Sequence, residues 1–236
     1  QGHHVAMTGD GVNDLLALKE ADCSIAVSDG SDASRQLSQI VLLNSDFTNL
    51  PRVVLEGRKA VHHVTRTAGV FFIKTLYSIM VSLCCFIMNI PFPFIPIQIT
   101  LIDACIEAYP SFLTIFEKDA AKIEENFLRT VLKRAFPFAA AITVMIVGIT
   151  LISPFSTYEN TTVMYLLLIL TSMTAVIKSC MPFTKLRIFL CVTMVLGTFC
   201  ALMLFPTLFE ISQITQRMFW FTVMIFSGII IFLSLI

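Results

Sequence analysis

The pattern of hydrophobic positions changes about a fifth of the way along the chain. Before that point, the short apolar runs at 4–7, 23–27 and 40–43 have the length of strands. The segments between them, 13–21 and 31–38, have the residue pattern of short helices. Strands that alternate with helices are typical of a parallel α/β sheet. We therefore expect the last strands of a larger sheet, whose other strands lie upstream.

A long helix is predicted to begin at Pro51, because proline is favoured in the first turn of a helix. The first half of this helix is basic, and its second half, from about Ala68, is apolar. The pattern fits one continuous helix, or two helices with a break at Gly57 or Gly69. In either case residues 51–67 form a cytoplasmic stalk.

Six apolar runs of about 19–23 residues follow, each long enough to cross roughly 30 Å of hydrocarbon. They lie at 68–90, 94–116, 135–153, 162–180, 188–206 and 218–236. The connecting segments 117–134 and 178–187 hold eight Lys and Arg residues, whereas the other three connections hold one. Basic loops stay in the cytoplasm. The pattern thus predicts a multi-pass plasma-membrane protein, with six helices over 68–236 and with residues 1–67 and the C-terminus cytoplasmic.

The composition agrees with a membrane protein. Hydrophobic residues make up 56% of the chain and charged residues 14%, whereas soluble domains carry about 25% charged residues. Lys+Arg and Asp+Glu both number 16, so net charge gives no reason to expect a nucleic-acid partner. The seven cysteines lack the spacing of a zinc site. Because the chain begins at Gln1 without an initiator methionine, we expect it to be the C-terminal piece of a longer protein.

The soluble part contains one motif with clear chemistry. Residues 8–14 read Thr-Gly-Asp-Gly-Val-Asn-Asp, directly after a predicted strand and before a predicted helix. Mg²⁺ is commonly bound by one or two carboxylates, with water and phosphate as its other ligands, and α/β sheets bind ligands at the carboxyl ends of their strands. The candidate catalytic residues are Thr8, Gly9, Asp10, Asn13 and Asp14, with Asp10 and Asp14 as the Mg²⁺ ligands. Alternatively, Asp10 and Asn13 only cap the helix and shape a turn.

A second candidate site lies within an apolar run. Asp103 and Glu107 are four residues apart, so they share one helix face, about 6 Å apart along the axis. An ionised side chain in hydrocarbon costs several kcal/mol, and such a pair therefore indicates a functional site. Thr100 shares this face, and Pro110 frees carbonyl oxygens that suit a hard cation. Alternatively, the acidic pair only hydrogen-bonds to neighbouring helices.

Lys74 lies one to two turns inside the first apolar run. One interpretation is that its side chain extends back toward the cytoplasm, as long basic side chains often do. The other is an ion pair with Asp103 or Glu107. In that pair the ammonium group would act as a tethered counter-cation.

The motif at 8–14 resembles the hinge motif of P-type ATPases, within the haloacid-dehalogenase-like phosphotransferases. The similarity continues through Ala17-Leu18-Lys19, Ile25-Ala26, Asp46-Phe47 and Glu56-Gly57-Arg58. Leu15-Leu16 departs from it, because many members have Ala-Pro there. The resemblance implies that residues 1–50 end a cytoplasmic α/β phosphorylation domain of the Rossmann-like type, with Mg²⁺ on Asp10 and Asp14.

The resemblance extends into the membrane part. The run 94–116 is similar to the sixth membrane helix of calcium and sodium pumps, where Asp103 and Glu107 fall on two cation-ligand positions. On the preceding helix, Thr75 and Ser78 stand where calcium pumps place Asn and Glu. A site with fewer carboxylates is expected to bind fewer ions. A lysine at a similar position to Lys74 occurs in the gastric proton pump.

Taken together, the resemblance implies part of an ATP-driven cation pump that works through an aspartyl-phosphate. The family's nucleophile motif, Asp-Lys-Thr-Gly-Thr, does not occur here, so this fragment alone should be inactive and ATP should act through upstream domains. Mg²⁺ is the expected cofactor, and the lipid bilayer and the transported cation are the expected partners. Ca²⁺ is favoured, then Mg²⁺ or Mn²⁺, then monovalent ions. The alternatives are a passive channel or secondary transporter, and a non-catalytic regulatory membrane subunit.

Overall fold

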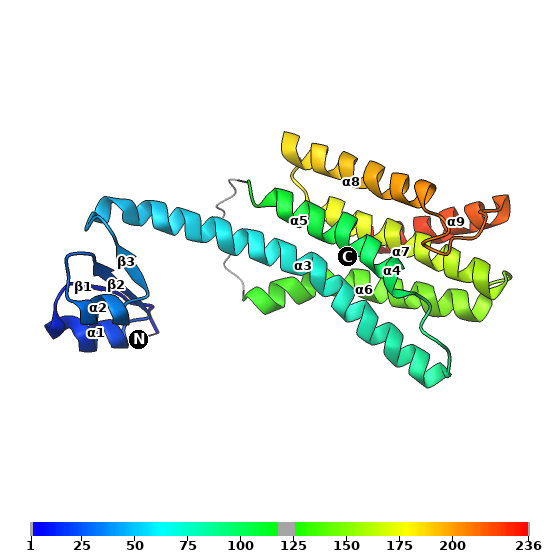
Figure 1. The fold of residues 1–236 in the computed structure, drawn as a ribbon. Helices are drawn as coiled ribbons and strands as arrows, with labels where there is room; N and C mark the ends of the chain where they lie inside the picture. Colours follow the sequence, from blue (N-terminus) through cyan, green and yellow to red (C-terminus); the bar gives the residue numbers. More distant parts are fainter. Residues whose placement is uncertain (1, 118–125, 236) are drawn as a thin grey trace. The chain divides into compact units, whose positions relative to one another are not determined.

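A computed structural model describes residues 2–117 and 126–235 of the chain (Figure 1). Two of the basic loop residues used above, Lys118 and Lys122, lie outside the described residues. The chain forms two compact units, Gln1–Gly57 and Arg58–Ile236, and each is described by itself.

The first unit is built on a three-stranded parallel sheet in the order β1-β2-β3. The strands are β1 (Ala6–Gly9), β2 (Cys23–Val27) and β3 (Ile40–Leu42), and the helices are η1 (Val12–Asp14), α1 (Leu15–Glu20), α2 (Asp32–Leu37) and η2 (Phe47–Asn49). The central strand carries the buried residues Ile25 and Ala26, as expected for a parallel strand covered on both faces. The sheet has the predicted class, although three strands alone do not identify the larger domain.

Helix α3 (Leu50–Met88) is continuous over 39 residues. The predicted alternative with a break at Gly57 or Gly69 is therefore wrong. Both glycines lie where an added Cβ atom would meet no heavy atom within 4 Å, so neither marks a tight approach of another segment.

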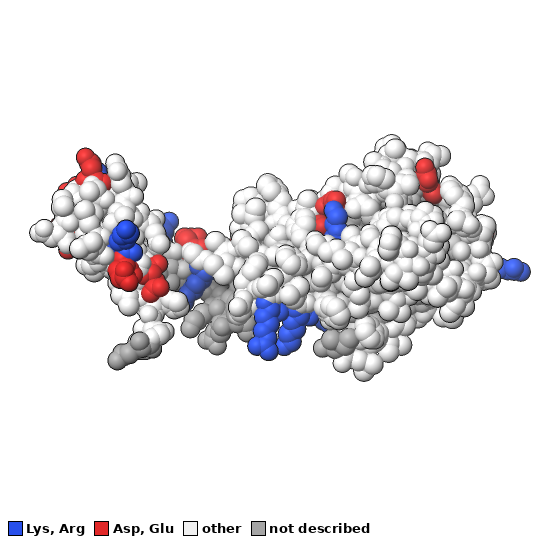
Figure 2. All heavy atoms as spheres, turned by 90° about the horizontal axis from the view of Figure 1, so that it is seen from below, with Lys and Arg blue, Asp and Glu red and all other residues white. Residues whose placement is uncertain are grey.

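Five helices among the described residues are long and apolar enough to cross a membrane. They are α3 with the turn before it, α6 (Phe127–Ile152), α7 (Thr157–Ser179), α8 (Lys185–Leu204) and α9 (Gln216–Ser234). Many large apolar side chains face outward, such as Phe86 and Ile152, which are 84% and 82% exposed. Figure 2 shows one broad, mostly uncharged face of the second unit. These features support a multi-pass membrane protein.

The predicted span 94–116 is not one of these five helices. It consists of three consecutive shorter segments, α4 (Pro96–Leu101), the π-helix η3 (Ile102–Ala108) and α5 (Tyr109–Thr114). Pro110 explains the irregular turn, because proline has no N–H and its ring would clash with the Ile106 carbonyl of a regular helix. The Tyr109 amide instead bonds the Ala104 carbonyl, five residues back. The sixth span is therefore not confirmed.

The core of the second unit lies around α7. This helix contacts α6, α8, α9 and η3, and its residues Tyr165, Leu167, Leu168 and Ile169 are all 0% exposed. The π-helix η3, which carries the acidic pair predicted from the sequence, packs on this buried helix.

Candidate functional site

The motif at 8–14 folds into a tight turn directly after β1. The Asp14 carboxylate oxygen Oδ2 accepts hydrogen bonds from the backbone amides of Asp10 and Gly11, at 3.2 and 3.3 Å. A Cβ atom added at Gly9 would lie 2.6 Å from the Asp14 Cβ atom, so the chain can turn this closely only with glycine there. Asp14 thus shapes the turn, a role that the sequence analysis considered for Asp10 and Asn13.

The backbone of Asp10 is fixed by a second segment. Its carbonyl oxygen accepts hydrogen bonds from the Ser31 amide at 2.7 Å and the Ser34 hydroxyl at 3.2 Å. A Cβ atom added at Gly30 would lie 2.7 Å from the same carbonyl oxygen. Sequence reasoning missed these positioning residues; in the structure Ser31 is also the N-cap of α2, and its side chain accepts a hydrogen bond from the Ser34 amide. The result is a rigid backbone with the exposed Asp10 side chain at the carboxyl end of β1.

The donor set at this turn fits Mg²⁺. Two carboxylates lie within one turn, and the side chains of Thr8 and Asn13 are exposed beside them. No group of three or more His, Cys, Asp or Glu residues that could hold a metal occurs in the described part of the chain. Mg²⁺ needs only one or two carboxylates, because water and phosphate complete its shell.

Within the membrane part, Lys74 and Asp103 form an ion pair. The Lys74 Nζ atom lies 2.6 Å from both Oδ1 and Oδ2 of Asp103. Of the two interpretations of Lys74, the structure thus has the ion pair. The two side chains are 32% and 37% exposed, so the pair is half-buried between α3 and η3.

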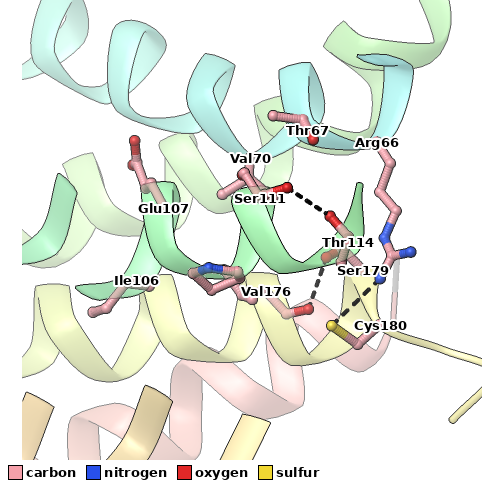
Figure 3. Close-up of a pocket in the computed structure, with 11 residues that line it drawn as sticks. Arg66, Thr67, Val70, Ile106, Glu107, Ser111, Thr114, Val176, Ser179 and Cys180 are labelled. Carbon is pink, nitrogen blue, oxygen red and sulfur yellow. Dashed lines mark hydrogen bonds between the residues drawn. The ribbon is translucent and has the colours of Figure 1, made fainter. Parts of the chain in front are cut away.

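Glu107 lies deeper than this pair. The residue is only 3% exposed, and its Oε2 atom has no hydrogen-bond partner among the described residues. In Figure 3 its side chain points from the helical run of η3 toward α3. When all three groups are ionised, Lys74, Asp103 and Glu107 together carry one negative charge in excess.

A small cavity of about 20 Å³, with a lining of both polar and apolar residues, adjoins Glu107 (Figure 3). It is large enough for about one water molecule. Its polar lining residues, besides Glu107, are Arg66, Thr67, Ser111, Thr114, Ser179 and Cys180. The Thr114 hydroxyl donates to the Ser111 carbonyl at 3.0 Å, and Arg66 Nη2 donates to Cys180 Sγ at 3.5 Å. The cavity therefore extends from Glu107 to the arginine described next.

Three buried charged residues meet just beyond the predicted span 94–116. Glu117 accepts hydrogen bonds from Arg66 Nη1 at 2.6 Å, and from Arg187 Nε and Nη2 at 2.5 and 2.8 Å. The three side chains are 12%, 9% and 5% exposed. Burial alone would raise the pKa of Glu117, but the bonds and charges of Arg187 and Arg66 hold that pKa below its ordinary value of 4.5. This Arg66–Glu117–Arg187 cluster joins α3, the end of α5 and α8.

The sequence analysis missed this cluster because it counted Arg66 only among the basic residues of the predicted stalk helix, and Arg187 only among those of a cytoplasmic loop. It also grouped two threonines with the acidic pair, and the described contacts do not bring them there. Thr75 and Thr100 are exposed, and their hydroxyls bond carbonyls of their own helices, those of Phe71 and Pro96. Ser78 is half-buried and follows Lys74 by one turn.

Comparison with known proteins gives close relatives. No protein-family model matches the chain. The chain is 42% identical over 230 residues to a probable cation-transporting ATPase, exp7, of Streptococcus pneumoniae; the match covers 92% of this chain and 29% of that protein. It is also 42% identical over 151 residues to the calcium-transporting ATPase CtpE of Mycobacterium bovis, covering 60% of this chain and 19% of that protein.

A more distant relative is the sodium/potassium-transporting ATPase subunit alpha-1 of Oreochromis mossambicus. It is 35% identical over 124 residues, covering 52% of this chain and 12% of that protein. The chain thus spans less than a third of the length of each of these relatives. The family predicted from the hinge-like motif is confirmed, and the chain belongs to the cation-transporting P-type ATPases.

Proposed function

We propose that this chain is part of an ATP-driven cation pump, with its transported ion bound beside Glu107. The observation that carries the proposal is a buried carboxylate with an unpartnered oxygen, next to an ion pair inside the membrane part. Intramembrane ionisable groups of this kind are rare and serve ion pathways or relays. The names of the relatives, which are cation-transporting ATPases, support the same activity.

On the cytoplasmic side, Asp10 and Asp14 would hold Mg²⁺. The ion would neutralise charge on a phosphoryl group during transfer. The chain's own contribution is position, because Ser31 and Ser34 fix the Asp10 carbonyl and leave its carboxylate exposed. Residues 1–50 would then end a haloacid-dehalogenase-like phosphorylation domain, and the phosphorylated aspartate would lie outside this chain.

The proposed topology has six spans, with α4, η3 and α5 forming the second. These segments follow one another without a gap from Pro96 to Thr114, and at 1.5 Å per residue they would extend about 28 Å. That length is close to the roughly 30 Å of a hydrocarbon core. Residues 1–67 and the C-terminus would lie in the cytoplasm, below the plasma membrane.

Ca²⁺ is the favoured cargo, with one ion in each cycle. Carboxylate oxygens suit Ca²⁺, and calcium appears in the name of the relative CtpE. The Lys74 ammonium group already neutralises Asp103, so only Glu107 remains to balance a bound ion. Mg²⁺ or Mn²⁺ is the next candidate.

The test is phosphoenzyme formation from labelled ATP by the full-length pump, with Mg²⁺ always present and Ca²⁺, Mn²⁺, K⁺ or Na⁺ added in turn. One ion should stimulate phosphorylation. Glu107→Gln should then require about tenfold more of that ion or more, whereas Glu210→Gln, in an exposed loop, should behave as wild type. Asp10→Asn should abolish the phosphoenzyme with any ion. Absence of an ion-stimulated phosphoenzyme, together with cation flux that needs no ATP, would favour a passive channel.

A further inference from the structure

A second buried oxygen without a partner belongs to the same region. Tyr77 of α3 is only 1% exposed, and its hydroxyl has no hydrogen bond with a described residue. It follows Lys74 by three positions, so the two side chains leave adjacent parts of one helix face. Lys74 in turn contacts Asp103, with Nζ and Oδ1 2.6 Å apart, and Glu107 lies one helical turn beyond Asp103. Tyr77 is therefore in the same region as the acidic pair.

Another buried tyrosine shows that this bundle can satisfy such a group. Tyr165 of α7 is 0% exposed, and its hydroxyl donates to the Gln98 carbonyl oxygen at 3.1 Å. Buried polar groups in proteins nearly always have a partner. The Tyr165 hydroxyl therefore has a hydrogen-bond partner within the protein, whereas the Tyr77 hydroxyl has none among the described residues.

The electrostatics of the region indicate what the missing partner is. Lys74 and Asp103 neutralise one another. Glu107 has the other unpartnered oxygen, and it adds one negative charge when its carboxyl group is ionised. One anionic and one neutral oxygen are ligands that a hard cation accepts. A single cation between them would satisfy both oxygen atoms and balance the charge.

We propose that Tyr77 is a further residue of the cation site, and that its hydroxyl oxygen binds the transported ion together with Glu107 Oε2. This inference rests on the proposed function, because only that function identifies the bound cation as the transported ion. The resemblance to calcium pumps pointed instead to Thr75 and Ser78 on the same helix. The Thr75 hydroxyl bonds the Phe71 carbonyl, and Ser78 is half-buried. The ligand class is a hard divalent cation such as Ca²⁺ or Mn²⁺.

The test is equilibrium binding of radioactive Ca²⁺ and of Mn²⁺ to the purified full-length protein without ATP. Tyr77→Phe removes only the hydroxyl, and we expect it to weaken binding of the preferred ion about tenfold. Tyr165→Phe is the matched control, because it removes a buried hydroxyl from another helix, and it should bind as wild type. Wild-type affinity in Tyr77→Phe, or an equal loss in both variants, would overturn the proposal.

A double variant separates direct binding from general packing. If Tyr77 and Glu107 hold the same ion, adding Tyr77→Phe to Glu107→Gln should weaken binding by much less than tenfold, because contacts to one ligand are not additive. Fully additive losses would contradict a shared ion. A variant that is less stable can still be compared with wild type. For each variant, the rise of the thermal midpoint on adding cation is measured against the cation-free state of that variant, and this rise reports how strongly the variant binds the cation.

Direct binding also keeps the two proposals apart. If the wild type binds the cation through Tyr77 but forms no cation-dependent phosphoenzyme, the pump proposal fails and the Tyr77 site stands. If the phosphoenzyme responds to the cation but Tyr77→Phe binds the cation as wild type does, the pump proposal stands and the Tyr77 site is rejected.

Discussion

Glu117 lies between two arginine side chains, and all three residues are largely buried. Its carboxylate accepts from both guanidinium groups, and the planar Arg187 group binds it through two nitrogens. Removing one member of a buried charged cluster leaves the charge of the others less compensated, which typically costs about 3–5 kcal/mol. The cluster therefore stabilises the junction of three helices only while Glu117 is present and ionised.

We predict that Glu117→Gln lowers the free energy of unfolding of the full-length protein by about 3 kcal/mol, because two buried arginines then face a neutral amide. Thermal unfolding in detergent measures the change. Glu210→Gln, in an exposed loop, is the matched control and should change the free energy of unfolding by less than about 0.5 kcal/mol. Equal midpoints for the two variants would contradict a stabilising role for the cluster.

The same residue predicts a pH dependence. Because the pKa of Glu117 in the folded protein lies below its ordinary value of 4.5, its ionised form contributes stability above that pH, and the contribution is lost as the pH falls below it. As the pH falls below about 4.5, the thermal midpoint should therefore fall more steeply in wild type than in Glu117→Gln. Parallel pH profiles would show that Glu117 is not the titrating group.

At the scale of elements, the π-helix η3 is the irregularity with the greatest consequence. It spans Ile102–Ala108 and so contains both acidic residues. A π-turn inserts an extra residue into a helical turn, and such turns are frequent at functional sites. Relative to a regular helix, it changes the direction in which Asp103 and Glu107 point toward α3.

Pro110→Ala tests this positioning. Alanine restores the missing N–H and removes the ring that disfavours a regular turn, so we expect part of η3 to return to α-helical geometry. Cation binding by the full-length protein should weaken about tenfold. The matched control is Pro137→Ala, since Pro137 also lies inside a helix, α6. Unchanged binding in Pro110→Ala would show that the π-turn does not orient the site.

The elements differ in how well the sequence predicted them. The strands at 23–27 and 40–43 were predicted to within one residue, because short β-branched runs between polar segments have few alternative structures. The π-helix was not predicted, since the apolar pattern continues through 94–116 without a change of period. The Arg66–Glu117–Arg187 cluster could not be predicted from spacing, because Glu117 lies 51 and 70 positions from its partners. The Tyr77 hydroxyl was missed because the orientation of one tyrosine among many apolar residues depends on tertiary packing.

At the scale of the whole molecule, the number of spans decides the topology. Five long apolar helices alone would place the two ends of the second unit on opposite sides of the membrane. If α4, η3 and α5 also cross, both ends lie on the same side. The basic loops predict this second arrangement.

We predict that the C-terminus and the connection between α7 and α8, residues 180–184, both face the cytoplasm. Reporter fusions that are active only on one side of the membrane, placed after residue 235 and within 180–184, measure this. A fusion within 153–156, between α6 and α7, should report the opposite side. A C-terminus on the outer side would exclude a sixth span by α4, η3 and α5.

The ion pair of Lys74 with Asp103 has a consequence for the membrane potential. If the pump works as proposed, with Glu107 ionised, its empty site carries one negative charge and its site loaded with a divalent ion carries one positive charge. Without the lysine, the empty site would carry two negative charges and the loaded site would be neutral. Each elementary charge that crosses 100 mV corresponds to about 2.3 kcal/mol. The lysine would therefore divide the electrical work between the loaded and the empty half of the transport cycle, and both halves would respond to voltage.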